Sequence, residues 1–209
     1  MTGNEGKGGR SLPRAWPWLA LPCLLATCTA LAATAAGDSS EHGRSFQSGT
    51  VERVVDGDTV ELRIGAHRAR VHLHGVEAPE RDQPWGKRSM QALGDLVLGQ
   101  SVDLEYSARD PSMRDGAVMF VGEEEVGAAM VRDGHAWADR AHLGQRDEEL
   151  CELEAEARAA RRGLWSQPQQ QWVAPWEYRH RLFRSRYTDY SQETAEQCAA
   201  ALRRKHQPG

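Results

Sequence analysis

The nine residues VVDGDTVEL, 54–62, decide the fold because they begin and end as a strand and are interrupted in the middle. Valine and leucine alternate with polar residues, as in a half-buried β-strand, but Asp56 and Asp58 interrupt the run with Gly57 between them. Carboxylates disfavour strands and cost free energy when they are buried without partners. Residues i and i+2 of a strand share a face, so we expect both carboxylates on one side of a bend that the glycine permits.

The chain on either side of this stretch predicts a mixed α+β domain. Alternating apolar and polar residues predict five strands, and apolar residues at helical spacing predict three helices. The strands are expected at 50–55, 59–64, 67–76, 101–108 and 117–122, and the helices at 84–99, 125–134 and 146–163. Five short strands with helices closing them favour a small Greek-key barrel.

A second acidic stretch, HLHGVEAPERD at 72–82, leaves the third predicted strand and supplies Glu77 and Glu80. Pro79 fixes the turn between the two glutamates, so they can take different tasks. Hard cations such as Ca²⁺ prefer several oxygen ligands. We therefore expect one glutamate to bind a metal beside Asp58 while the other reaches a water molecule. The alternative is that DGDT is only a turn and GVEAPE only a polar loop.

Taken together, these motifs resemble the staphylococcal nuclease (thermonuclease) family over about residues 50–166. The resemblance rests, in order, on VVDGDTVEL, GVEAPE, DPSMRDGAVMFV, EVGAAMVRDGHAW and LEAEARAARRGLW. It implies a five-stranded OB-fold β-barrel with three helices, followed by a C-terminal helical or irregular extension at 167–209 that it does not cover. It also implies Ca²⁺-dependent hydrolysis of phosphodiester bonds in DNA or RNA. We expect the protein to be a monomer.

The resemblance also assigns roles by position. The metal would be held by two carboxylates and one backbone carbonyl, with a further carboxylate nearby: Asp58, Glu77, Ala78 and Asp56. Glu80 takes the place of the residue that activates or orients the attacking water. Arg114 matches one of the family's two phosphate-binding arginines.

The position of the family's other phosphate-binding arginine is occupied here by His72. Histidine offers one donor and titrates near pH 6.5, whereas arginine is always charged and grips two oxygens at once. Arg70 lies two residues earlier on the same strand face, and its guanidinium could partly replace the two parallel donors that His72 lacks. In addition, Glu77 stands where the family usually has aspartate. Losing one transition-state donor typically costs about 10²–10³ in rate, so the resemblance implies a weakened nuclease in which protonated His72 binds phosphate.

Two alternatives remain open. His72 and His74 form an H-x-H pair that, with Asp58 or Glu77 near, could bind Zn²⁺ or Mn²⁺ in place of Ca²⁺. The protein could also be a catalytically inactive OB-fold module that binds nucleic acid or a protein partner. The formal net charge of −4 argues against binding driven by phosphate attraction alone.

The N-terminus predicts a secretory signal peptide at 1–35. A basic start precedes the uncharged run 15–36, and Ala-Thr-Ala ends at the predicted cleavage site. Cleavage implies a secreted or periplasmic protein with no stable membrane association. The alternatives are a membrane anchor retained through 15–36 and a lipoprotein with Cys28 as acceptor. The polar segment 36–49 is expected to be flexible.

The mature chain keeps two cysteines, Cys151 and Cys198. In an oxidising exported compartment, two remaining cysteines suggest one disulfide, which would tether the polar, arginine-rich tail. The alternative is two buried free thiols.

The extension 167–209 contains the basic and aromatic run YRHRLFRSRY at 178–187. Its aromatic side chains could stack on nucleic acid bases beside the arginines, which include Arg179. They could instead pack the tail onto the barrel while the arginines face the acidic body, and this interpretation is favoured.

Overall fold

The computed structural model describes residues 44–107, 109–110, 113, 116–140, 142, 148–183 and 194–205. All of them belong to one compact unit, 38–209. The predicted signal peptide and the alternative anchor at 15–36 lie outside the described residues. Within the described part, no helix combines the length and the apolar character needed to cross a membrane.

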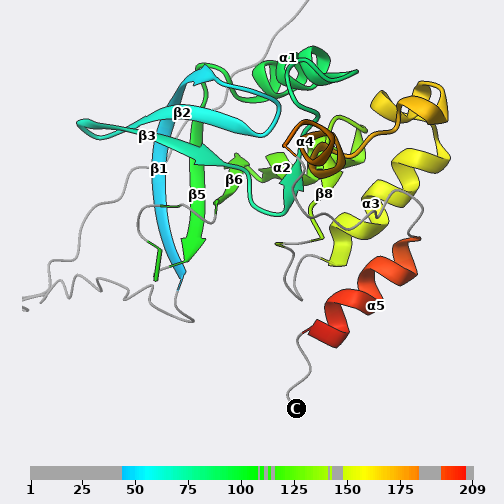
Figure 1. Cartoon of the computed structure of the whole chain (residues 1–209). Coiled ribbons are helices and arrows are strands. Elements are labelled where there is room, and N and C mark those ends of the chain that lie inside the picture. The colour runs from blue at the N-terminus through cyan, green and yellow to red at the C-terminus, as the bar shows by residue number, and fades with distance from the viewer. Residues whose placement is uncertain are drawn as a thin grey trace, which may run out of the picture. The chain divides into compact units, whose positions relative to one another are not determined.

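The centre of the fold is a six-stranded antiparallel sheet (Figure 1). Its order is β3-β2-β1-β5-β6-β7, and the separate strands β4 and β8 pair with each other. The bounds are β1 Arg44–Val54, β2 Thr59–Ile64, β3 His67–His72, β4 Val76–Glu77, β5 Ser101–Ser107, β6 Val118–Val121, β7 Glu124–Glu125 and β8 Trp137–Ala138. The alternating pattern forms the sheet because Val60 and Leu62 of β2 and Val71 of β3 enter the core, while their polar neighbours face outward.

Five α-helices of the described part of the chain accompany the sheet: α1 Gly86–Val97, α2 Val126–Arg132, α3 Glu148–Ala159, α4 Pro175–Phe183 and α5 Ala195–Lys205. Two short 3₁₀ turns, Gly163–Ser166 and Gln169–Gln171, connect α3 to α4. In α1 the buried residues Ser89, Leu93 and Val97 recur every four positions, which is the spacing of one helical face. The first three helices are those that the sequence predicts, and α4 and α5 belong to the extension.

The mixed α+β class is confirmed, and β1, β2, β3, β5 and β6 correspond to the five predicted strands. The sheet has six strands because the two-residue β7 adds to β6. The sheet is not closed into a barrel, since β3 and β7 are its two edges. An isolated parallel bridge between Leu73 and Ala117 nevertheless brings the end of β3 to the start of β6.

Residues 44–49, which we expected to be flexible, form the first half of β1. Their backbone pairs with β5 from Arg44 opposite Ser107 to Gly49 opposite Val102, so the ladder satisfies their donors and acceptors. The sequence pattern did not predict this part of the strand, because its first five side chains are not buried and Phe46 is 61% exposed. The rest of the segment, 36–43, lies outside the described residues.

The extension packs on the domain through tryptophans. The ring of Trp137 in β8 lies 4.5 Å, centroid to centroid, from that of Trp165. Trp176 of α4 lies 5.6 Å from Trp137, and Trp172 lies 5.3 Å from Trp165. Edge-to-face aromatic pairs at these distances are favourable. The aromatic cluster therefore fixes where α4 leaves the domain.

A buried ion network joins α3 to β8. The Arg140 guanidinium donates to both carboxylate oxygens of Glu154, at 2.6 and 3.0 Å, and the Ala138 N–H donates to the same carboxylate at 2.7 Å. Arg158, one turn along α3, also pairs with Glu154. Because the side chains of Arg140 and Glu154 are almost fully buried, each depends on its partners for the hydrogen bonds that water would otherwise supply.

The last helix is held against α3 (Figure 1). The Sγ atoms of Cys151 in α3 and Cys198 in α5 lie 2.00 Å apart, as in a disulfide bond, and their Cα atoms are 5.9 Å apart. Arg203 of α5 also donates to Glu148 of α3 at 2.7 Å.

Candidate active site

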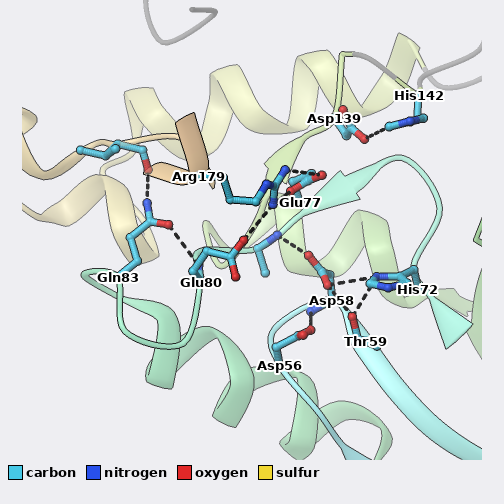
Figure 2. Close-up of polar contacts among 12 residues, drawn as sticks. Asp56, Asp58, Thr59, His72, Glu77, Glu80, Gln83, Asp139, His142 and Arg179 are labelled. Carbon is cyan, nitrogen blue, oxygen red and sulfur yellow. Dashed lines mark hydrogen bonds and ion pairs between the residues drawn. The ribbon is translucent and has the colours of Figure 1, made fainter. Parts of the chain in front are cut away.

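One pocket of about 280 Å³ gathers acidic side chains from three separate parts of the chain. They come from the β1–β2 turn, from β4 with the loop that follows it, and from the residue after β8. These acids are Asp56, Asp58, Glu77, Glu80 and Asp139. Figure 2 shows most of them around a shared space, with Arg179 of α4 reaching in from the other side.

The β1–β2 turn explains the aspartate pair and its glycine. The Asp56 carboxylate accepts a hydrogen bond from the Asp58 N–H at 3.2 Å, which stabilises the tight turn. Gly57 packs directly on α1 and on the loop after β4. A Cβ built at this position would lie 2.1 Å from Ser89 Oγ and 2.6 Å from Ala78 Cβ. The glycine is required because the backbone approaches its neighbours too closely for a side chain.

The Asp58 carboxylate is held on two sides. One oxygen accepts from the Ala78 N–H at 2.7 Å, and the other accepts from the Thr59 hydroxyl at 2.8 Å. His72 Nδ1 lies 2.9 Å from Thr59 Oγ1 and 3.5 Å from the Asp58 carboxylate. Since the Thr59 hydroxyl donates to Asp58, its oxygen is left to accept from an Nδ1–H of His72. The turn, the loop after β4 and the end of β3 therefore meet at Asp58.

Burial and crowding separate the pKa values of the two aspartates. Burial, followed by the charge of Asp58, raises the pKa of Asp56 to about 6. Burial would also raise the pKa of Asp58, but the hydrogen bonds that it receives, led by that of His72, outweigh burial and lower it. The same bond to Asp58 raises the pKa of His72 above its ordinary value of 6.5, although burial opposes this. The two pKa shifts act in the same direction, because each favours the charged form of the His72–Asp58 pair.

The second acidic pair meets a guanidinium from the extension (Figure 2). Arg179 donates to both oxygens of Glu77, at 2.8 and 3.1 Å, and to Glu80 at 2.9 Å. Gln83 supports this loop from behind: its side-chain carbonyl accepts from the Glu80 N–H at 3.0 Å, and its amide donates to the Val173 carbonyl. The extension thus contacts the loop after β4 through both side chains and backbone.

Burial raises the pKa of Glu77, assisted by the charges of Asp139 and Asp58, although Arg179 opposes the shift. Burial would lower the pKa of Arg179, but the hydrogen bonds and charges of Glu77 and Glu80 outweigh it and raise the pKa. The pocket is therefore crowded with negative charge, and Arg179 compensates part of it.

The structure brings six of the predicted site residues to the pocket: Asp56, Asp58, His72, Glu77, Ala78 and Glu80. It does not bring Arg70 there. Arg70 donates to Glu61 at 2.8 Å, and Glu61 also binds Arg53 at 2.6 Å, on an exposed face of the sheet. Arg114 lies outside the described residues.

Three pocket residues were missed by the sequence analysis as site residues: Asp139, His142 and Arg179. His142 Nδ1 lies 2.5 Å from the Asp139 carboxylate at the edge of the pocket. No motif marks Asp139 or His142 in the sequence. The sequence did give an indication for Arg179, because it lies in a basic run that follows an acidic domain. That pattern did not identify which acidic residues it would contact.

The donors suit a hard divalent cation by type, since carboxylate oxygens dominate the pocket. Burial, assisted by the neighbouring carboxylates, raises the pKa values of Asp56 and Glu77. They do not form a ready-made cage. Among the described residues, no three His, Cys, Asp or Glu side chains converge as metal ligands. His72 and His74 both line the pocket, but they do not form such a group of three with any other described side chain. Two groups already accept strong hydrogen bonds, Asp58 from Ala78 and Glu77 from Arg179, so metal binding requires some of these bonds to be exchanged.

The family model described as staphylococcal nuclease homologue matches residues 70–167. Protein ParB of Escherichia coli is 38% identical over 140 residues, which cover 63% of this chain and 78% of that protein. A micrococcal nuclease of Shigella flexneri is 36% identical over 140 residues, 63% of this chain and 79% of that protein. An uncharacterized endonuclease of Escherichia coli O157:H7 is 38% identical over 134 residues, 64% and 85% respectively.

Proposed function

Because this chain belongs to the family of staphylococcal nuclease homologues, we propose that it hydrolyses phosphodiester bonds in DNA or RNA with the help of a divalent cation. Relatives named as a micrococcal nuclease and as an endonuclease support a nuclease-type function and a nucleic acid substrate. The observation that carries the proposal is the pocket in which Asp56, Asp58, Glu77 and Glu80 gather from two turns. Such a group of carboxylates is costly unless a cation lies between its members.

In this proposal the cation is Ca²⁺. Asp58, Glu77 and the backbone carbonyl of Ala78 hold it, with Asp56 close behind. A bound divalent ion supplies a positive charge that polarises a phosphoryl oxygen of the substrate. Asp58 is suited to this task because its pKa is lowered, so it is ionised at neutral pH. Glu77 is one methylene longer than the aspartate usual in the family, which lets its carboxylate reach further from β4.

Glu80 orients and deprotonates the attacking water in this scheme. Its side chain is about one-third exposed at the mouth of the pocket and lies within reach of solvent. Arg114 binds the phosphate and stabilises its developing charge, as the family resemblance implies. His72, whose Nδ1 lies 3.5 Å from the Asp58 carboxylate, supplies one further donor when it is protonated.

We also propose that His72 makes this a weak enzyme. Its Nδ1 is engaged with Thr59 and Asp58, so only its other ring nitrogen can turn to a phosphate. A guanidinium in its place would offer two parallel donors.

Three further parts of the proposal concern the whole chain. The signal peptide 1–35 exports the protein to the periplasm or the medium, unless the apolar run 15–36 is retained as an anchor. The mature protein acts as a monomer. Its five longer strands form the OB-type barrel of the family, and the Leu73–Ala117 bridge supports closure between β3 and β6.

The test is digestion of single-stranded DNA and of RNA by the purified mature protein, with Ca²⁺ and with a chelator. Glu80→Gln keeps the size of the side chain but removes its basicity, so we expect a rate about 10²–10⁴ lower. Glu156→Gln, an exposed glutamate on α3, is the matched control and leaves the rate unchanged. His72→Arg is expected to raise the rate.

Chelator-resistant digestion, or equal rates for Glu80→Gln and wild type, would contradict the proposal. Absence of digestion under all conditions, together with retained oligonucleotide binding, would identify the chain as the inactive binding module.

A further inference from the structure

The active-site pocket receives its guanidinium from the extension, about 100 residues further along the chain than the acidic loop that it contacts. We propose that Arg179 of α4 is a substrate-binding residue of this site, which grips the phosphate that is to be cleaved. The inference rests on the proposed nuclease function and deepens it. It assigns a role to a segment that the match to the family model, residues 70–167, does not include.

The position of Arg179 carries the inference. One of its terminal nitrogens donates both to Glu77 and to Glu80, at 2.8 and 2.9 Å. Glu77 is the proposed metal ligand, and Glu80 is the proposed water-orienting residue. A phosphate under attack would have to lie near both the residue that would hold the metal and the residue that would orient the water. A group that bridges Glu77 and Glu80 is therefore placed beside the position that the phosphate must occupy.

Charge supports the same conclusion. The described lining of the pocket contains five carboxylates, and Arg179 is its single lysine or arginine. A phosphodiester carries a negative charge, so a permanent cation in the described lining favours its entry into this acidic pocket. His72 and His142 line the pocket too, but histidine is charged only when protonated.

The extension is built to hold Arg179 in place. Trp176, three residues earlier, packs on Trp137 of the domain with the ring centroids 5.6 Å apart. The Val173 carbonyl accepts from Gln83 of the acidic loop. One contact joins α4 to β8 and the other joins Val173, just before α4, to the acidic loop, so α4 is oriented before any substrate arrives.

Arg179 is also able to change partners. It is 37% exposed, so the guanidinium is not sealed in the interior. A guanidinium presents several donors in one plane and binds phosphate through two parallel hydrogen bonds. On substrate binding it exchanges its bond to Glu80 for a phosphate oxygen, which also releases Glu80 for the water. No covalent bond changes in this step.

The experiment compares three variants of the mature protein. Arg179→Ala removes the guanidinium, and Arg179→Lys keeps the positive charge but not the two parallel N–H donors. Arg203→Ala is the matched control, because Arg203 is an arginine of the same extension, pairs with a glutamate at 2.7 Å and does not line the pocket. Each is assayed for kcat and KM on single-stranded DNA at saturating Ca²⁺, and near-ultraviolet circular dichroism checks that the tryptophan packing is retained.

We expect Arg179→Ala to lower kcat/KM by about 10²–10³, the usual cost of one lost transition-state donor, with Arg179→Lys between it and wild type. A second readout is independent of turnover. In the Glu80→Gln background with Ca²⁺, fluorescence anisotropy measures the affinity for a labelled single-stranded oligonucleotide. Adding Arg179→Ala is expected to weaken binding about 10- to 100-fold, as for a lost hydrogen bond to a charged group. Arg203→Ala changes neither quantity.

Two results would overturn the inference. Higher activity of Arg179→Ala at saturating Ca²⁺ would make Arg179 an autoinhibitory latch on Glu77. Activity and oligonucleotide affinity equal to those of Arg203→Ala would make its role structural. Failure of the proposed function looks different: the wild type then shows no Ca²⁺-dependent digestion, while the anisotropy measurement still decides whether Arg179 binds nucleic acid.

Discussion

At the scale of single residues, the turn between β1 and β2 depends on the absence of one Cβ. Gly57 does not have a positive φ, so its role is space and not backbone freedom. The nearest atoms to a Cβ would be Ser89 Oγ and Ala78 Cβ, and Ala78 is the residue whose N–H anchors Asp58. A side chain here therefore pushes the two halves of the site apart.

We predict that Gly57→Ala lowers the free energy of unfolding by about 1–3 kcal/mol, the usual cost of overpacking, and reduces nuclease activity more than Gly94→Ala does. Gly94 is the matched control because it lies inside α1, where a new Cβ would meet only Val54, at 3.9 Å. Alanine there should stabilise the protein by about 0.5–1 kcal/mol. Urea denaturation of both variants measures the difference. Equal stability of the two would show that the turn can move away from Ser89.

Single residues also show what sequence spacing can and cannot predict. Asp58, Glu77 and Glu80 could be predicted because they lie in two short motifs, VVDGDTVEL and GVEAPE, whose order and spacing resemble those of the nuclease family. Arg70 was expected near the pocket because it shares a strand face with His72. It stands directly opposite Glu61 in the β2–β3 ladder, and this cross-strand ion pair holds it on the outer surface.

At the scale of elements, α3 is fastened to the sheet region by one buried carboxylate. Glu154 forms ion pairs with Arg140 and Arg158 and accepts a hydrogen bond from the backbone of β8. β8 in turn pairs with β4, which carries Glu77. The ion network therefore helps to hold β4 and the acidic loop that follows it in place. The helical pattern predicted α3, but it did not predict that a charged residue would face inward.

We predict that Glu154→Gln lowers the free energy of unfolding by about 3–5 kcal/mol, because it leaves the buried guanidinium of Arg140 without its counter-charge. Glu156→Gln, exposed on the same helix, should change stability by less than about 0.5 kcal/mol. Thermal and denaturant unfolding of the two variants test this. A loss for Glu154→Gln as small as that of the control would mean that water reaches and screens the network.

The placement of α4 could not be derived from local pattern. Its contact with the site joins residues 179 and 77, and nothing in the sequence between them encodes that distance. The interpretation that the basic run packs on the domain with its arginines facing acidic residues agrees with the contacts of Arg179 but named no partner. Tryptophan packing decides the placement, since Trp137 and Trp165 belong to the domain and Trp172 and Trp176 to the extension.

At the scale of the whole molecule, the Cys151–Cys198 link closes a segment with a sequence separation of 47. Closing a loop of this length removes conformational freedom from the unfolded chain, worth about 4 kcal/mol in the entropic treatment and 2–4 kcal/mol in typical measurements. The segment contains both the linker and α4. The link therefore also limits how far Arg179 can move from the pocket.

We predict that Cys198→Ser, measured without reductant, lowers the free energy of unfolding by about 2–4 kcal/mol and weakens oligonucleotide binding. Reductant should reproduce the effect in the wild type and leave the variant unchanged. Mass spectrometry of the untreated wild type under non-reducing conditions should find no free thiol at Cys151 or Cys198. Two free thiols there would contradict the predicted link.

The late position of Arg179 has a consequence for biosynthesis. A ribosome makes the chain from the N-terminus, so Glu77 and Glu80 emerge long before the helix that neutralises them. A chain that ends after the first 3₁₀ turn lacks Arg179, so Glu77 and Glu80 have no guanidinium from α4 to pair with. Only translation beyond residue 179 supplies this contact.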